Sequence, residues 1–310
     1  MNLSSVLADA GGATQLAVRT LALGGATVVI GASAFRWVVM GSAARANTVT
    51  GDVERQVERQ VARIGMVAAV VVTIAAAWRI VAQADAFLSP GDPLLPLVVA
   101  VLKTTWGRAA TVQVAAALVV LVRFWSTRNA SSRGWTVALG AAVVMAATPA
   151  WMGHAAATES RTVIAIGADM LHVGAAGGWA GAVIVLALVL RHLQRETGDG
   201  AMAAELISRF RILALVCAGT LLGTGTTSAL FRLAAPSDLF TSPYGLILSA
   251  KLAIVASAAI LGRRHSQTAA LRARTGGASA VTASIGAEAV LFVLVLALSG
   301  LLSASPPPSD

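Results

Sequence analysis

The fold is decided by a long apolar stretch near the middle of the chain. Residues 162–190 read TVIAIGADMLHVGAAGGWAGAVIVLALVL, and Asp169 and His172 are their only ionisable side chains. About 20 apolar residues in a helix are enough to cross the hydrocarbon core of a bilayer. In lipid every backbone N–H and C=O needs an internal partner, which an α-helix supplies within one segment. The stretch therefore predicts a membrane-spanning helix.

Comparable apolar stretches recur along the whole chain. The 310 residues are 57% hydrophobic and only 12% charged, about half the charged share of an ordinary soluble domain. We place spanning helices at residues 14–40, 62–84, 107–126, 135–156, 162–190, 207–232, 241–262 and 283–303. The sequence thus predicts an all-α, polytopic transmembrane helix bundle with about eight spans, forming a single transmembrane domain over residues 1–310.

Two segments beside the spans are helical in pattern without being spans. Residues 93–107, PLLPLVVAVLKTTWG, are too short to cross a membrane. We predict a surface helix there, or a partly re-entrant segment that leads into the third span. Residues 52–65 are charged with a helical period, so we expect them to extend the second helix into water.

The distribution of positive charge orients the bundle. The loops after the first, third, fifth and seventh spans hold 15 Lys and Arg residues, whereas the loops on the opposite side hold four. Cytoplasmic loops carry the excess of Lys and Arg, so both termini are predicted to lie outside. This topology accounts for the net charge of +9, and no basic stripe interleaved with aromatic residues predicts nucleic-acid binding.

Ionisable side chains within spans are costly and often functional, and the fourth and fifth spans carry the best cluster. His154 ends the fourth span and His172 lies in the fifth, with Met152 and Met170 beside them. Imidazole and thioether together suit copper, particularly Cu(I). Asp169, one turn from His172, is placed to fix its tautomer. We predict a metal site of these five residues in the outer half of the bundle; the alternative is that each histidine only hydrogen-bonds between helices.

Further polar side chains share helix faces in the later spans. The sixth span has Cys217, Thr220, Thr224 and Thr227 at helical spacing. This face either lines an ion path or packs closely, with each hydroxyl bonded to its own backbone. Trp179 shares the face of Asp169 and His172, while Gly174 with Gly178, and Gly177 with Gly181, have the GxxxG spacing that allows close backbone approach.

The seventh span places Tyr244 and Lys251 on one face, and the eighth span contains Glu288. A buried lysine in lipid is expected to have a partner. A Lys251–Glu288 pair is therefore considered, either as a structural contact between the last two helices or as part of a charge relay.

Several stretches resemble the CopD family of bacterial copper-resistance and copper-uptake membrane proteins. The matching pieces are TTWGRA (104–109), GHA (153–155), ADMLHVGAAGGWAGA (168–182), SRF (208–210) and SPYGLILSAKLAI (242–254). The resemblance covers residues 95–308 and leaves two N-terminal spans, residues 1–94, outside it. It implies a multi-pass protein of the bacterial inner membrane that handles copper, often beside a periplasmic copper-binding protein. It also implies that His154 and His172 are candidate ligands and that Lys251 and Glu288 are functional.

The leading hypothesis is copper import across the inner membrane through a His-lined, outward-facing site, with copper as Cu(I) or Cu(II). One alternative is a b-type haem protein that transfers electrons, with His154 and His172 as axial ligands. Another is a non-transporting scaffold for a copper chaperone. The motifs GxSxG, HExxH and GxxxxGK[ST] do not occur in the sequence, so an enzyme is not predicted. The expected partners are the lipid bilayer, a copper ion and the periplasmic protein.

Overall fold

A computed structural model describes residues 12–41, 51–126, 132–152, 162–196, 200–274, 278–305 and 307–308. These residues form helices joined by short loops, and within them there is no strand. Eight helices are long and apolar enough to cross a membrane. The prediction of an all-α bundle with eight spans is therefore confirmed.

The spans follow the chain in order, and two are built from more than one helical segment. The first is α2 (Gly12–Ala34), continued by the π-helix η1 (Phe35–Met40), and the fifth is α8 (Thr162–Ala176), η4 (Gly177–Gly181) and α9 (Ala182–Glu196). The others are α4 (Gly51–Asp85), α6 (Thr105–Ser126), α7 (Ser132–Met152), α10 (Gly200–Arg232), α12 (Pro243–Arg274) and α13 (Ala278–Leu302). Two short helices, α5 (Leu94–Lys103) and α11 (Asp238–Thr241), lie in connections.

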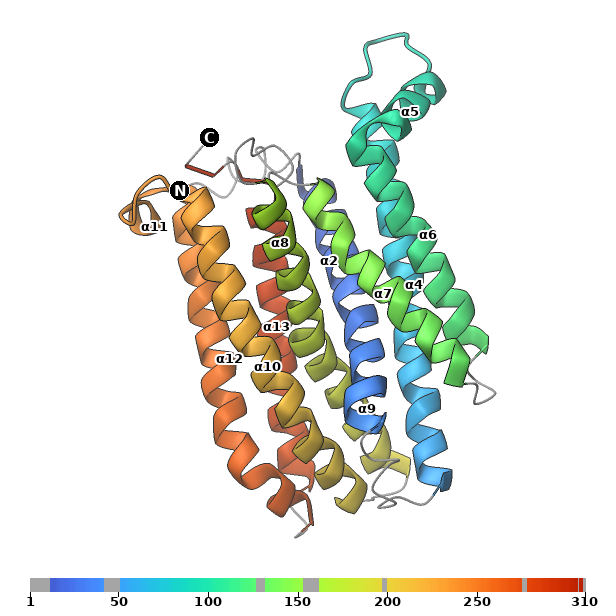
Figure 1. Cartoon of the computed structure of the whole chain (residues 1–310), viewed down its shortest axis with the longest axis vertical. Coiled ribbons are helices and arrows are strands. Elements are labelled where there is room, and N and C mark those ends of the chain that lie inside the picture. Colours follow the sequence, from blue (N-terminus) through green and yellow to red (C-terminus); the bar gives the residue numbers. More distant parts are fainter. Residues whose placement is uncertain are drawn as a thin grey trace.

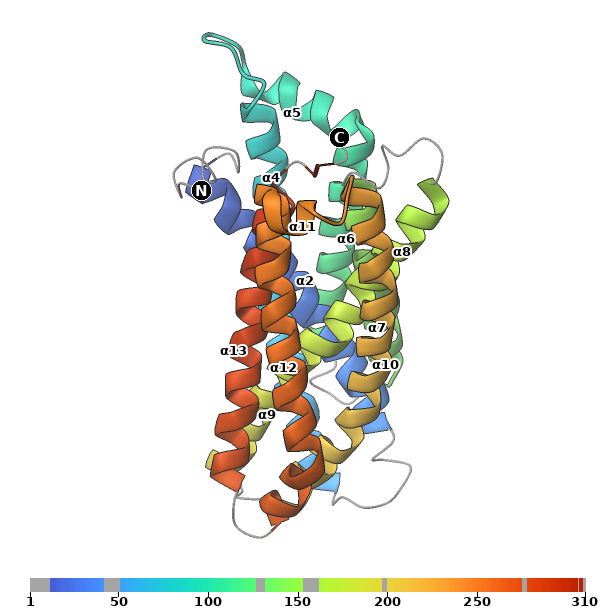
Figure 2. The ribbon, with the colours of Figure 1, turned by 90° about the vertical axis from the view of Figure 1, so that its left-hand side faces the viewer.

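The fifth span is the most buried of the eight and forms the centre of the bundle. Its first part, α8, packs against α7 and α10, and its last part, α9, packs against α2 and α13. Figure 1 shows α10, α12 and α13 on one side of this helix and α4 and α6 on the other. Figure 2, after a quarter turn, shows α13, α12 and α10 side by side at the front of the bundle. Helices from both halves of the sequence thus surround the fifth span.

Glycines let α2 approach the middle of the fifth span closely. A Cβ added at Gly181 would overlap the carbonyl oxygen of Thr27, and one added at Gly177 would overlap the side chain of Ile30. Gly178 faces Cys217 of α10 in the same way, whereas a Cβ at Gly174 would meet nothing within 4 Å. The predicted close approach is confirmed at Gly177, Gly178 and Gly181, all of which belong to the π-helix η4.

The segment between the second and third spans is a short helix, not a further span. Helix α5 runs across the end of the hairpin formed by α4 and α6 (Figures 1 and 2). Gly91 has a φ of +96°, which favours glycine, in the turn that precedes α5. Of the two alternatives for residues 93–107, this arrangement agrees with the surface helix. We call the end of the bundle that carries α5 and α11 the α5 end.

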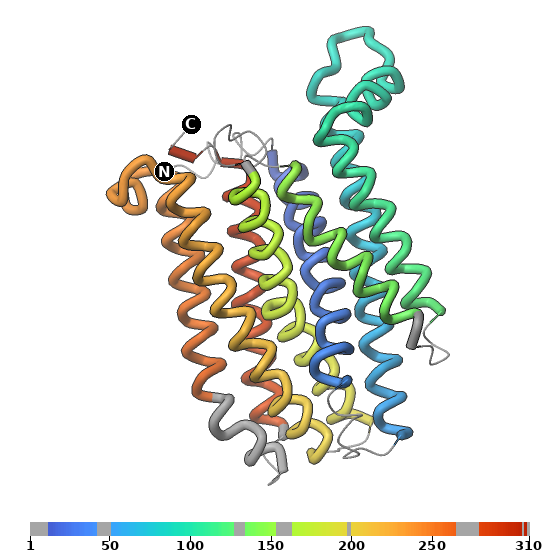
Figure 3. The backbone as a smooth tube through the Cα atoms, in the orientation of Figure 1, coloured from blue at the N-terminus to red at the C-terminus, as the bar shows by residue number. Residues whose placement is uncertain are grey.

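The charged start of the second span continues the helix, as predicted. Helix α4 runs without a break from Gly51, and Glu58 on it forms an ion pair of 2.5 Å with Arg36. Val57 and Val61 are fully buried, so one side of this extension packs against the bundle. The first turns of α2 lie beside the last turns of α13 at the α5 end (Figure 3), where a Cβ added at Gly300 would overlap Thr20.

Candidate functional site

The imidazole of His172 bonds to the neighbouring helix α10. His172 lies ten residues after Thr162, the first residue of α8, and so about 15 Å along the helix from the α5 end. Its Nδ1 is 3.1 Å from the hydroxyl oxygen of Thr224. That hydroxyl donates its hydrogen to the carbonyl oxygen of Thr220 at 2.7 Å. A hydroxyl has only one hydrogen, so it accepts a hydrogen bond from Nδ1–H of His172, and Nε2 keeps its lone pair.

Asp169, one turn nearer the α5 end, forms an ion pair with the last residue of α10. The Arg232 guanidinium donates to both carboxylate oxygens, at 3.1 and 3.3 Å, and the Ser228 hydroxyl donates to one of them at 3.3 Å. Arg232 also donates to the phenol oxygen of Tyr244 on α12 at 3.5 Å. The expectation that Asp169 fixes the tautomer of His172 is therefore not met, because Thr224 takes that role.

Lys251 faces these groups from α12. It is close enough to interact electrostatically with His172, Asp169 and Arg232. Lys251 lies eight residues into its helix from Pro243, about 12 Å from the α5 end and at a depth similar to that of His172. Seven residues thus line up from the α5 end towards the middle of the bundle, and we call them the polar column: Asp169, His172, Thr224, Ser228, Arg232, Tyr244 and Lys251.

The structure does not bring Lys251 and Glu288 together. The predicted contact between the last two spans is present, because α12 packs against α13. However, Glu288 is buried against Gly262, whose added Cβ would lie 3.0 Å from a carboxylate oxygen. Gly262 lies eleven residues beyond Lys251, or about 16 Å along the helix. The suggested ion pair is therefore wrong, since a lysine side chain does not span that distance.

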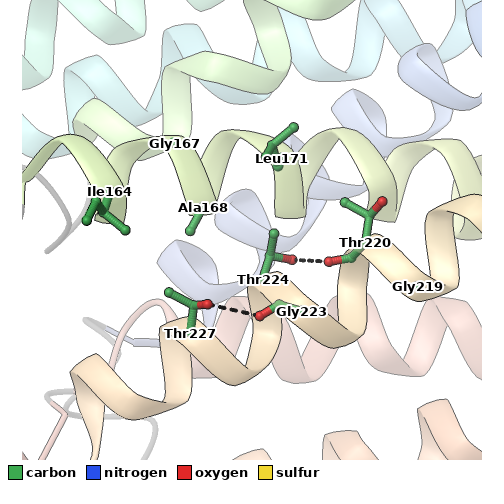
Figure 4. Close-up of a pocket in the computed structure, with 9 residues that line it drawn as sticks. All are labelled: Ile164, Gly167, Ala168, Leu171, Gly219, Thr220, Gly223, Thr224 and Thr227. Atoms are coloured by element: carbon green, nitrogen blue, oxygen red, sulfur yellow. Dashed lines mark hydrogen bonds between the residues drawn. The ribbon is translucent and has the colours of Figure 1, made fainter.

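The hydroxyls of the sixth span bond to their own helix. Thr220, Thr224 and Thr227 donate to the carbonyl oxygens of the residues four positions earlier. Together with α8 they line a groove of about 460 Å³ (Figure 4), whose walls include Gly167, Leu171 and Gly219. Thr224 borders both the groove and His172. The hydroxyls are therefore bonded to their own backbone, as in the second alternative, but this face borders an open groove and is not closely packed at Gly219 and Gly223.

The remaining predicted residues lie in separate surroundings. Met152, at the end of α7, packs against a small apolar cluster from α4, α5 and α6. Trp179 is buried in η4 and meets the ring of Phe292 edge to face, with centroids 5.1 Å apart. Cys217 is buried against Gly178, and Met170 is half-buried on α8. His154 lies outside the described residues, two positions beyond the end of α7.

Two protein-family models match the chain. Residues 8–163, half of the chain, match the model described as copper resistance protein D-like, N-terminal domain, and residues 204–302 match copper resistance protein D. The chain belongs to the copper resistance protein D family. Together the two matched regions include six of the eight spans entirely, and the second includes all five of the polar column's α10 and α12 residues.

Two curated proteins are similar to the chain. Copper transport protein CutJ of Bacillus subtilis (strain 168) is 29% identical over 205 residues, which are 66% of this chain and 37% of that protein. Copper resistance protein D of Pseudomonas syringae pv. tomato is 35% identical over 114 residues, 36% of this chain and 37% of that protein. The chain therefore aligns with well under half the length of either relative. No solved structure matches it.

The prediction of a copper-related membrane protein is confirmed by this family and by the eight spans. Sequence reasoning missed two members of the polar column, Ser228 and Arg232. Arg232 entered the topology argument only as a loop charge. A carboxylate within a span needs a cation at its own depth in the membrane. Arg232 ends the neighbouring helix α10 close to the depth of Asp169. The need of Asp169 for such a cation could therefore have indicated this ion pair from the sequence.

Among the described residues, no group of three or more His, Cys, Asp and Glu side chains is close enough to hold a metal ion. The polar column therefore offers one unprotonated imidazole nitrogen next to two cationic side chains and one carboxylate.

Proposed function

We propose that this member of the copper resistance protein D family moves copper across the bacterial inner membrane, with His172 as a ligand on the path. The observation that carries the proposal is the hydrogen bond between Nδ1 of His172 and Thr224. It leaves the Nε2 lone pair for the metal and holds the ring in one orientation, as partners of metal-binding histidines commonly do. Copper is the substrate of this process, not a resident cofactor.

His154 is our candidate for the step before His172. It follows Met152, the last described residue of α7, by two positions, and α7 ends at the α5 end. His172 is about 15 Å deeper along α8. We therefore propose two successive ligands instead of one site shared by both histidines. Met170 and Met152 are proposed thioether ligands beside these steps, because thioether sulfur suits Cu(I).

Asp169 serves this path through Arg232. Its carboxylate holds the Arg232 guanidinium at the α5 end, and the Tyr244 phenol oxygen accepts a further hydrogen bond from it. A copper cation that enters the column competes with the guanidinium for Asp169. We propose that this ion pair closes the column at rest and that Lys251 adds a second positive charge that keeps other cations out.

The direction of transport is proposed from the charge distribution. We propose that the α5 end faces outside, because α2, α6, α9 and α12 each run towards the opposite end of the bundle before a basic loop, and such loops favour the cytoplasm. Copper then enters from outside, delivered by a periplasmic copper-binding protein, and leaves past Glu288 towards the cytoplasm. Single cysteines introduced at residues 90 and 198 of a Cys217→Ala variant test this orientation: an impermeant maleimide should label residue 90 in intact cells and residue 198 only after lysis. Labelling of residue 198 in intact cells would reverse the direction.

Uptake of radioactive copper into proteoliposomes tests the function itself. His154→Ala and His172→Ala should each reduce the initial rate, whereas His192→Ala should not. His192 is a suitable control because it lies near the other end of the same span, in α9, where its Nε2 is 3.3 Å from Nε2 of Gln56. Rates that are equal for all four proteins would reject the proposed path, provided that each variant elutes as a folded species.

A further inference from the structure

A second groove lies between α6 and α7, on the far side of the bundle from α10 and α12. It has a volume of about 440 Å³. Its lining comes from one face of each helix: Thr105, Arg108, Ala109 and Val112 on α6, and Val144, Ala147, Thr148 and Trp151 on α7. These positions follow the spacing i, i+3, i+4, i+7 on both helices, so the groove runs along the helix pair. The polar column does not include any of them.

The polarity of the groove changes along its length. Thr105 and Arg108 belong to the first turn of α6, and Trp151 belongs to the last turn of α7, so all three lie at the α5 end. Val112 and Val144 lie deeper, and they are 46% and 44% exposed. Deeper in the groove, the Thr148 hydroxyl donates to the carbonyl oxygen of Met145, so its own hydrogen is satisfied within α7. A cationic rim therefore leads into an apolar channel open to the membrane.

The rim is also suited to an anion. The Arg108 side chain is exposed, and Lys103, at the elbow between α5 and α6, is exposed as well. At the same rim Thr104 caps the start of α6: its hydroxyl oxygen accepts the N–H of Gly107 at 3.0 Å and its carbonyl oxygen accepts the N–H of Arg108 at 2.9 Å. The positive end of the helix dipole still favours negative charge there. The guanidinium carbon of Arg79, on α4, lies 5.6 Å from the ring centroid of Trp106 on α6. Neither of these two residues lines the groove.

We propose that the groove between α6 and α7 is a binding site for an anionic phospholipid. The phosphate binds at Arg108 and the start of α6, and one acyl chain lies along Val112 and Val144. The cationic rim lies where the headgroup of such a lipid would be, and the apolar part of the groove lies deeper in the membrane, where its acyl chain would be. Trp151 lies beside the headgroup, the depth at which tryptophan is enriched in membrane proteins.

The experiment measures lipid retention by native mass spectrometry of the full chain released from detergent that contains equal amounts of phosphatidylglycerol and phosphatidylcholine. The wild-type protein should retain phosphatidylglycerol preferentially. Arg108→Gln should lower that retention about fivefold, which is the loss expected for one basic contact with an anionic headgroup. Val112→Trp should lower retention of either lipid, since its ring occupies the channel. Arg123→Gln, at the other end of α6, should change nothing.

Three further measurements keep the test decisive. Circular dichroism confirms that each variant is folded, and Arg108→Lys should restore most of the preference. Inorganic phosphate added in place of lipid should not raise the unfolding temperature, whereas phosphatidylglycerol should; equal stabilisation would indicate a free-anion site and overturn the proposal. Equal retention of both lipids in all variants would also overturn it, as would a change of oligomeric state in Val112→Trp with lipid retention intact.

Discussion

The Nδ1 atom of His172 lies 3.1 Å from the hydroxyl oxygen of Thr224, and this contact joins α8 to α10 in the middle of the bundle. The same hydroxyl is bonded to the carbonyl oxygen of Thr220. The proton on Nδ1 is therefore fixed by α10, and the metal-binding role that we propose for His172 depends on a threonine of the neighbouring helix.

Replacing Thr224 tests this dependence. Thr224→Val keeps the shape of the side chain but removes the acceptor for Nδ1–H, so we expect Cu(I) affinity to fall about 10- to 100-fold. Thr224→Ser keeps the hydroxyl and should stay close to wild type. Competition with a chromophoric Cu(I) chelator measures both. Equal affinities for the valine and serine variants would show that Thr224 does not prepare the histidine.

The Asp169–Arg232 pair is expected to contribute to stability. Its side chains keep 18% and 31% of their exposure, so we expect a coupling energy of about 1–2 kcal/mol, below that of a fully buried pair. A double-mutant cycle with Asp169→Asn and Arg232→Gln measures it by unfolding in detergent. The Asp52–Arg55 pair, which is 91% and 58% exposed, is the matched control. A coupling energy no larger than that of the control would contradict the expected contribution.

The glycines of η4 give a prediction about packing. Gly181→Ala forces a methyl group into the backbone of α2, which cannot move as a flexible side chain would, so we expect a loss of about 3 kcal/mol or more. Gly219→Ala places its methyl group in open space and should be neutral or stabilising by up to about 1 kcal/mol. Unfolding of the two variants under the same conditions checks this difference. Similar losses in both would mean that α2 does not approach η4 so closely.

The sequence predicted the features that depend on composition along one helix. Hydropathy located all eight spans, and GxxxG spacing indicated the close contact at Gly177 and Gly181. Features that depend on the relative rotation and height of two helices were not predictable in this way. Asp169 was predicted to bond to His172 because the two residues share a helix face. In the structure both partners come from α10 instead: Arg232 bonds to Asp169, and Thr224 bonds to His172.

Position along the helix axis explains why the predicted Lys251–Glu288 pair does not form. Lys251 and Glu288 lie on touching helices, so hydropathy and topology allow them to pair. The length of α12 separates them, because Glu288 meets this helix at Gly262. The sequence around Lys251 and around Glu288 does not indicate this separation along the helix axis.

The central claim is that His172 is a copper ligand, and the most direct measurement is Cu(I) bound per protein after equilibration with a buffered Cu(I) source. The full chain, His172→Ala and His192→Ala are compared in the same lipid nanodiscs. We expect His172→Ala to lose at least one bound copper or to bind it about 10-fold or more weakly, while His192→Ala matches the wild type. Identical stoichiometry and affinity for His172→Ala and the wild type would contradict it.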